Sequence, residues 1–219
     1  MRTALVSLLI SIASYASSAE FFVLSGTSTL LVLGETKTSD VEEIQRYIAD
    51  EQIDSIILNG PGGSLEAGYA IAEIILEQGL TTIVPKNTDC ASACSIIFSA
   101  GTERVMEGGS RLGFHLPFVR LNDTNDVDKH CLVLKQRNGL GGFRTPSRGL
   151  TQGYSMNLDN YCLMLTYQEG LRDMRRLSKY IARDGISEVV LDLIINTESS
   201  DMTWVGVAQA REYGLVNSN

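Results

Sequence analysis

The sequence contains few histidines, no CxxC pair and no excess of positive charge. Its 219 residues include only two histidines, His115 and His130, and four cysteines. A structural zinc site needs four Cys or His ligands at characteristic short spacings, so neither a metal nor a cofactor is expected. Acidic side chains outnumber basic ones 26 to 18, for a formal net charge of −8, and no stretch concentrates Lys and Arg into a patch the size of a binding groove. Nucleic acid and acidic membrane surfaces are therefore not expected as partners.

Long apolar runs are also lacking, except in the first residues, which have the features of a secretory signal. Arg2 precedes an apolar run that ends near residue 16, and small residues follow up to Ala19. The run contains serines and is shorter than the roughly 20 apolar residues that a membrane span needs. We expect residues 1–19 to be a cleaved signal peptide, with an uncleaved anchor as the alternative. The mature chain would then be periplasmic or secreted, without a membrane span.

Such a compartment permits disulfides, and the four cysteines can pair in three ways. Their spacing does not choose among these pairings. We favour a bond between Cys131 and Cys162, with Cys90 and Cys94 either bonded to each other or free. For Cys94, which falls on the inward side of an expected helix, a buried thiol is the favoured interpretation. A Cys90–Cys94 bond would instead stiffen the turn between them.

The first half of the chain alternates between strand and helix signals. The β-branched run "SIIL" predicts a buried strand that ends at "NGP". The stretch "SLEAGYAIAEIILEQG" predicts a helix that Ser64 caps and Gly79 ends, and Ser39 with Glu42 suggests a capping box for the helix before it. The strand "TTIV" follows. This alternation predicts one α/β domain over residues 20–219, with right-handed crossovers around a single sheet.

Further along, "ACSIIFSAG" predicts a buried helix, and "ERVMEGGSRLGFH" predicts two short strands separated by a Gly-Gly turn. Residues 158–183 and "SEVVLDLIINT" have helical patterns. Between them, residues 120–156 are dominated by Asn, Asp, Gly, Arg and Thr. We expect this segment to be a long polar excursion on the surface.

Three stretches follow the ends of predicted strands: "NGPGGS" at 59–64, "CASAC" at 90–94 and "GFHLP" at 113–117. In parallel α/β sheets, ligands and catalytic groups gather at such ends. The consecutive glycines of the first stretch leave backbone N–H groups unobstructed just before a helix N-terminus, where negative charge is favoured. The turn could therefore stabilise an oxyanion. An ordinary tight turn between strand and helix is the alternative.

Ser92 directly precedes a predicted helix and is a candidate nucleophile, which requires a base within hydrogen-bond reach. His130 lies in the polar excursion, whereas His115 ends an apolar strand, so His115 is the candidate base. A lone serine or a lone histidine is more often structural. Together with the glycine turn, the two residues favour a catalytic site.

The stretches "NGPGGSLEAGYAI", "CASACSIIFSAG", "RLGFHLP" and "AREYGLVN" resemble, in order and approximate spacing, the proteolytic subunit of Clp protease and its relatives in the crotonase-like superfamily. The same stretches look like those of secreted Clp-protease-like proteins of bacterial envelopes. The resemblance covers residues 29–118 and, less well, the tail from about Tyr180. It implies a ClpP/crotonase-like spiral of repeated β-β-α units with a long helical C-terminal segment.

The same resemblance implies roles for single residues. The nucleophile falls on Ser92, the base on His115, and the two oxyanion-hole amides on Gly63 and Ala93.

The resemblance assigns the acid that would orient the imidazole less directly. An ungapped match on "EYGLV" places Met202 at its position, and a shift of one residue places Asp201 there. We expect Asp201 to be the acid, with Glu198 as a substitute and a dyad without an acid as a further possibility.

These residues predict a periplasmic serine hydrolase that cleaves peptide or protein substrates, forms a homo-oligomer through the helix after His115, and has no ATPase partner. Two alternatives belong to other classes. A non-catalytic scaffold or binding protein of the cell envelope would keep the glycine turn for folding. A crotonase-like acyl-CoA enzyme would need coenzyme A outside the cytoplasm.

Overall fold

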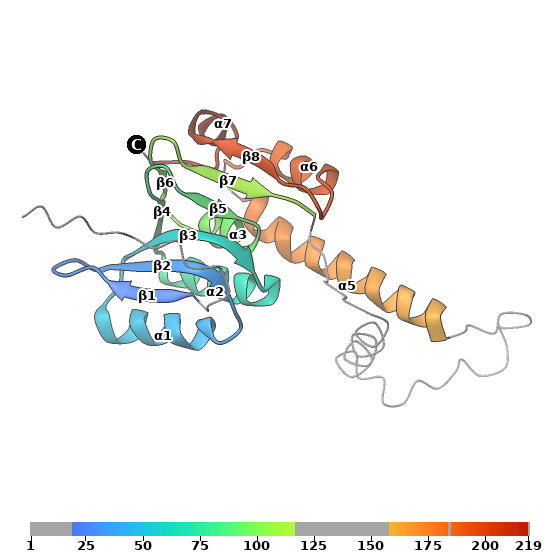
Figure 1. The fold of residues 1–219 in the computed structure, drawn as a ribbon, viewed down its shortest axis with the longest axis horizontal. Helices are drawn as coiled ribbons and strands as arrows, with labels where there is room; N and C mark the ends of the chain where they lie inside the picture. The colour runs from blue at the N-terminus through green and yellow to red at the C-terminus, as the bar shows by residue number, and fades with distance from the viewer. Residues whose placement is uncertain (1–18, 117–157, 184, 219) are drawn as a thin grey trace, which may run out of the picture.

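The computed structural model describes residues 19–116, 158–183 and 185–218, which form a mixed α/β structure. Within these ranges there are eight strands in one mixed sheet and six helices (Figure 1). The signal segment, the polar excursion, His130 and Cys131 lie outside the described residues, as does the side chain of Cys162. The strands are β1 (Glu20–Val23), β2 (Thr29–Thr36), β3 (Ser55–Gly63), β4 (Thr81–Val84), β5 (Asp89–Ala91), β6 (Arg104–Met106), β7 (Arg111–Phe114) and β8 (Thr203–Gly206). The helices are α1 (Asp40–Glu51), α2 (Leu65–Gln78), α3 (Ala93–Ser99), α5 (Leu158–Ile181), α6 (Val189–Asn196) and α7 (Val207–Glu212).

The sheet is parallel at its centre and antiparallel at its two ends. Its main path is β1-β2-β3-β5-β7-β8, and β4 joins β3 to β6 off this path. Only β1 on β2 and β8 on β7 are antiparallel among the described pairs. The α/β class and the strand-helix alternation are therefore confirmed. The strands β1 and β5 were not predicted from the sequence.

The strand β3 is longer than its sequence suggests. We predicted that it ends at "NGP", but it continues to Gly63, which pairs with Thr36 of β2. The reason is the close approach of neighbouring backbone: a Cβ on Gly60 would lie 2.2 Å from the carbonyl oxygen of Gly34. Glycine is the one residue that permits this contact, so a run that resembles a turn remains in the ladder.

The helix caps agree with the sequence at α2 and differ at α1. The Ser64 hydroxyl accepts a hydrogen bond from the Ala67 amide at 3.2 Å, and Gly79 ends α2 in a left-handed conformation, as predicted. The predicted capping box at Ser39 is wrong, because Ser39 has helical dihedrals and makes no capping bond. The carboxylate of Asp40 instead accepts from the Lys37 amide at 2.6 Å and closes the turn.

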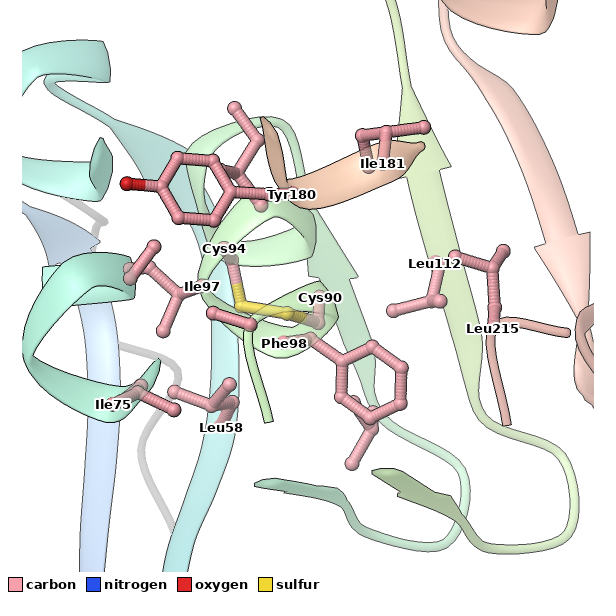
Figure 2. Close-up of a cluster of buried hydrophobic side chains, with 14 of the residues drawn as sticks. Leu58, Ile75, Cys90, Cys94, Ile97, Phe98, Leu112, Tyr180, Ile181 and Leu215 are labelled. Atoms are coloured by element: carbon pink, nitrogen blue, oxygen red, sulfur yellow. A yellow bond between two sulfur atoms is a disulfide. The ribbon is translucent and has the colours of Figure 1, made fainter. Parts of the chain in front are cut away.

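The helix α3 lies at the centre of the hydrophobic core, and every one of its residues is buried, as predicted. Figure 2 shows it enclosed by Ile75 of α2, Leu58 of β3, Leu112 of β7 and Ile181 of α5. Burying one such side chain contributes about 1.5–3 kcal/mol relative to leaving it exposed. Packing from several directions fixes α3 relative to the sheet, and with it the turn that carries Ser92.

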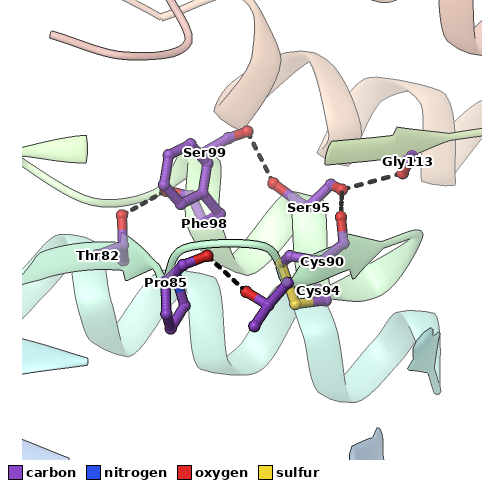
Figure 3. The surroundings of a disulfide bond; sticks show 9 residues. Thr82, Pro85, Cys90, Cys94, Ser95, Phe98, Ser99 and Gly113 are labelled. Carbon is purple, nitrogen blue, oxygen red and sulfur yellow. Dashed lines mark hydrogen bonds between the residues drawn. A yellow bond between two sulfur atoms is a disulfide. The ribbon is translucent and has the colours of Figure 1, made fainter. Parts of the chain in front are cut away.

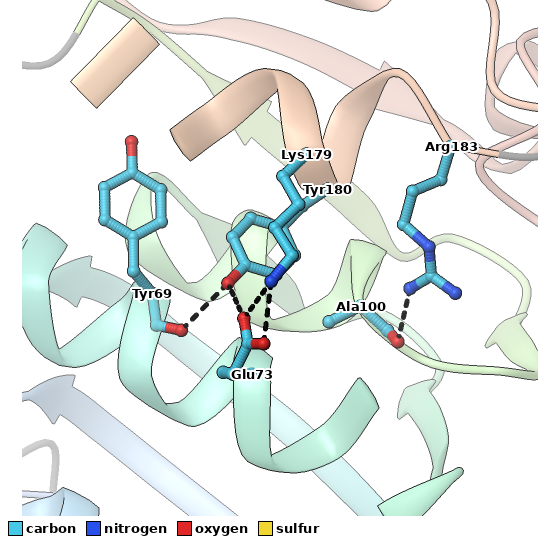
Figure 4. A network of polar contacts seen from close by, with 6 residues as sticks. All are labelled: Tyr69, Glu73, Ala100, Lys179, Tyr180 and Arg183. Carbon is cyan, nitrogen blue, oxygen red and sulfur yellow. Dashed lines mark hydrogen bonds and ion pairs between the residues drawn. The ribbon is translucent and has the colours of Figure 1, made fainter. Parts of the chain in front are cut away.

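A polar network holds the long helix α5 against α2 (Figure 4). The Glu73 carboxylate accepts hydrogen bonds from Lys179 Nζ and from the Tyr180 hydroxyl, the latter at 2.7 Å. The hydroxyl of Tyr69 donates to the backbone carbonyl of Asp173 at 2.9 Å. Burial, followed by the hydrogen bond to Glu73, raises the pKa of Tyr180. The rest of α5 extends away from the sheet (Figure 1).

Candidate active site

Ser92 occupies a sharp turn between β5 and α3. Its backbone dihedrals are φ 56° and ψ −122°, a left-handed conformation that a side chain rarely adopts. Such a conformation costs about 1–3 kcal/mol and persists only where the surrounding structure imposes it. A strained turn from strand to helix is also how many hydrolases expose a nucleophilic serine. The sequence placed Ser92 just before a helix but did not reveal this conformation.

Backbone contacts from β7 hold the turn in place. The Gly113 carbonyl accepts from the Ser92 amide at 2.8 Å and from the hydroxyl of the buried Ser95 at 2.9 Å. The same hydroxyl lies 2.7 Å from the Cys90 carbonyl oxygen (Figure 3). One serine side chain thus joins α3 to both β5 and β7. Since Gly113 is two residues before His115, these bonds also fix the distance between the serine and the histidine.

A disulfide joins Cys90 to Cys94 across the same turn, with Cα atoms 5.2 Å apart. Both cysteines are buried (Figure 3). The prediction of a buried free thiol at Cys94 is therefore wrong, and the alternative pairing is the one observed. Spacing alone could not choose, because two cysteines four residues apart can be bonded only where the backbone between them turns sharply. That turn is the one at Ser92.

The glycine stretch of β3 lies directly against the serine turn. A Cβ on Gly62 would come within 2.6 Å of the Ala91 carbonyl oxygen and 2.7 Å of the Ser92 Cβ. Gly62 also has a φ of 93°, which glycine adopts readily. The predicted meeting of the two turns is confirmed.

Two amides of these turns are the candidate oxyanion hole. Ala93 is the first residue of α3, so no carbonyl of its own helix can accept its N–H. Gly63 is the next residue after Gly62, at the end of β3. Their role in binding an oxyanion stays a prediction.

His115 follows β7 and contacts Ser92. Its Nε2 lies 2.8 Å from the Ser92 Oγ, and its Nδ1 lies 2.8 Å from the carbonyl oxygen of Leu116. A carbonyl only accepts, so in the neutral imidazole Nδ1 carries the hydrogen and Nε2 accepts from the serine hydroxyl. This tautomer is the one a general base requires. The Leu116 amide in turn donates to the Thr197 carbonyl at 2.9 Å, which anchors the orienting backbone.

The residue across the sheet from His115 is Met202, whose side chain is a thioether. The antiparallel register of β7 and β8 pairs Phe114 with Thr203, and its continuation places Met202 opposite His115. The Met202 sulfur lies 2.8 Å from where a Cβ on Gly113 would stand.

Asp201 lies in the turn before β8 and is exposed. Its Oδ1 accepts a hydrogen bond from the Met202 amide at 2.7 Å, and within the described part of the chain no hydrogen bond or ion pair joins it to His115. Glu198 is likewise exposed. Both assignments as the orienting acid stay predictions.

Ser92 and His115 open onto a pocket of about 410 Å³. The apolar part of its wall comes from the side chains of Leu65, Ile96, Phe114, Leu177 and Ile194. Glu35, at the end of β2, supplies the carboxylate among the described lining residues. A pocket of this size and character suits a peptide side chain or another small organic group.

Two features of the site escaped the sequence analysis. Glu35 has no motif around it and reaches the pocket only through the pairing of β2 with β3. The group of Leu116 that contacts His115 is its backbone carbonyl, and any residue type can supply a carbonyl. Among the described residues, no group of three His, Cys, Asp or Glu side chains could hold a metal ion, and no helix there has the length and hydropathy to cross a membrane.

Comparison of the chain with models of protein families and with curated proteins found no match in either. The functional argument therefore depends on the geometry of the site.

Proposed function

We propose that this chain is a serine hydrolase of the ClpP/crotonase-like spiral type that cleaves peptide bonds. The observation that carries the proposal is the 2.8 Å hydrogen bond between Ser92 Oγ and His115 Nε2, made by a serine in a left-handed turn at a pocket with both polar and apolar walls. A serine hydroxyl is a weak nucleophile without an adjacent base. Here the base, His115, lies within hydrogen-bond distance of Ser92, and the Leu116 carbonyl at Nδ1 holds the orientation of its ring.

The reaction follows from this geometry. Ser92 Oγ attacks the carbonyl carbon of the scissile bond while its proton passes to His115 Nε2. The amides of Gly63 and Ala93 donate to the oxyanion of the tetrahedral intermediate, and one such donor contributes roughly 3 kcal/mol in comparable enzymes. The imidazolium then gives the proton to the leaving nitrogen as the C–N bond breaks. Water, deprotonated by the same imidazole, hydrolyses the acyl-serine.

We assign the orienting role to the Leu116 carbonyl, with Asp201 as the alternative. The carbonyl lies 2.8 Å from His115 Nδ1, and its own backbone is anchored to Thr197. A carbonyl holds the tautomer as a carboxylate does, but it carries no full charge to stabilise the imidazolium.

The proposal extends to the setting of the enzyme. The N-terminal segment and the Cys90–Cys94 disulfide support a periplasmic or secreted location after cleavage near Glu20. The length of α5 beyond the body and the exposure of Leu171, at 54%, support a homo-oligomer formed through this helix. An ATPase partner is not expected in a compartment without ATP.

A fluorophosphonate probe tests the proposal on the mature chain from Glu20. We expect labelling of Ser92, found by peptide mapping, that is lost in Ser92→Ala and slowed at least 100-fold in His115→Ala. Ser39→Ala, at an exposed serine outside the described lining of the pocket, is the matched control and should label like the wild type. Labelling that persists in Ser92→Ala would overturn the nucleophile assignment. Folded protein that is never labelled would favour the non-catalytic scaffold.

A further inference from the structure

The described residues that line the pocket beside Ser92 include several apolar side chains and one carboxylate. Glu35 is the acidic side chain among its described lining residues, and the positive groups of Lys and Arg are missing from that lining. It is half-buried at the end of β2. A charged group in such a wall fixes the orientation of a ligand and selects its charge.

Glu35 is also close to the proposed oxyanion hole. The β2–β3 register pairs it with Gly62, and its Cγ lies 2.9 Å from where a Cβ on Gly63 would stand. The stem of the side chain thus packs on the backbone of Gly63, whose amide would receive the oxyanion. Any larger residue at position 63 would displace it.

The carboxylate has no cationic partner within the described part of the chain. The ion pairs found there use the carboxylates of Glu43, Glu73 and Asp89, and no described hydrogen bond involves the Glu35 side chain. A negative charge at this place raises the energy of an oxyanion that forms nearby, because like charges repel more strongly where water is partly excluded. A cation brought by the substrate would remove this penalty.

We propose that Glu35 is a specificity-determining residue that binds the cationic side chain of a lysine or arginine next to the scissile bond. The aliphatic stem of such a side chain would lie along the apolar wall formed by Leu65 and Phe114, with its charged end at the carboxylate. The proposal rests on the proposed function, since it names the substrate class of the same site.

Two peptidyl phosphonate diphenyl esters test the preference, one with a lysine analogue at the reactive position and one with a norleucine analogue. They share the same carbon chain and differ only in the ammonium group. We expect the wild type to react at least 10 times faster with the lysine probe. In Glu35→Gln, which keeps the shape of the side chain, the ratio should fall to about one, by a slower lysine reaction and a faster norleucine reaction. An unchanged ratio would overturn the inference.

Glu77→Gln is the matched control, because it removes the same charge from an exposed position near the other end of α2. Its ratio should equal that of the wild type. Added salt should lower the wild-type ratio and leave the Glu35→Gln ratio unchanged, since screening weakens only a charged contact.

Binding to Ser92→Ala separates this inference from the proposed function. In that background, calorimetry with the corresponding peptide amides should show at least fivefold tighter binding of the lysine peptide, lost when Glu35→Gln is added. If the fluorophosphonate fails to label but this preference is present, the hydrolase proposal fails and the role of Glu35 in recognition stands. If Ser92 is labelled and neither preference depends on Glu35, the inference fails and the hydrolase stands.

Discussion

Cys90 and Cys94 are bonded to each other across the turn whose middle residue is Ser92. The bond ties the last strand residues of β5 to the first turn of α3, beside the hydroxyl of Ser95 that contacts both β5 and β7. Covalent and hydrogen-bonded constraints thus converge on a residue whose backbone conformation is unfavourable by itself.

Removal of the disulfide should therefore affect stability and reactivity together. For the double variant Cys90→Ala/Cys94→Ala we expect a loss of about 2 kcal/mol in the free energy of unfolding, the value for a short closed loop. The fluorophosphonate labelling rate should fall severalfold, since the turn relaxes. Urea unfolding and timed labelling measure the two effects. Ile75→Val, a core change away from the turn, should destabilise without slowing the labelling, and equal slowing in both variants would contradict the argument.

Gly62 should tolerate no side chain. Gly62→Ala would place a Cβ 2.6 Å from a carbonyl oxygen and 2.7 Å from Ser92, both closer than real contacts. We expect a loss of at least 2 kcal/mol in the free energy of unfolding, or folded protein in which Ser92 no longer reacts. Gly108→Ala is the control, because nothing lies within 4 Å of its Cβ. Wild-type labelling of a stable Gly62→Ala would show that the two turns do not meet.

Asp201→Asn distinguishes a carbonyl-oriented imidazole from a triad. In a triad, the amide favours the wrong tautomer and lowers kcat about 10⁴-fold. With the Leu116 carbonyl at His115 Nδ1, we expect less than a tenfold change in the Ser92 labelling rate. The rate at fixed probe concentration is the measurement, with Glu198→Gln measured in parallel. A loss above 100-fold in Asp201→Asn would restore the acid assignment.

The sequence predicted those parts of the fold in which local pattern and tertiary environment agree. The helix α2 has an amphipathic pattern with a serine before it and a glycine after it, and both caps form as expected. The buried α3 likewise follows from a run of apolar and small residues. At α1, by contrast, the predicted serine does not form the cap. Ser39 has helical dihedrals, and the side chain of the next residue, Asp40, accepts the hydrogen bond from the Lys37 amide.

The site was predictable to the extent that side chains define it. Ser92 and His115 follow strand ends that parallel pairing brings together, and their hydrogen bond agrees with that prediction. The left-handed conformation of Ser92 and the carbonyl that faces His115 are features of the backbone. No particular residue type in the sequence indicates either of them. The disulfide was one of three open pairings until the turn at Ser92 was known.

The Glu73 network makes the docking of α5 dependent on pH. The hydrogen bond from Lys179, and then that from Tyr180, lowers the pKa of Glu73 below 4.5, the ordinary value for a glutamate. As the pH falls below that value, the unfolded chain takes up the proton first, so the stabilisation from the ionised carboxylate is present above pH 4.5 and is lost as the pH falls through the lowered pKa. The side chains are partly exposed, so the effect should be below about 1 kcal/mol.

Urea unfolding of the wild type and Glu73→Gln over the range from pH 3 to pH 7 measures this contribution. The difference in the free energy of unfolding between the two proteins should be constant from about pH 6 to pH 7 and should shrink toward pH 3. Glu77→Gln, an exposed change on the same helix outside the network, is the matched control and should show a smaller difference. A Glu73→Gln difference that stays constant over the whole range would mean that the carboxylate titrates alike in the folded and unfolded chain, and that the contacts with Lys179 and Tyr180 do not stabilise its ionised form.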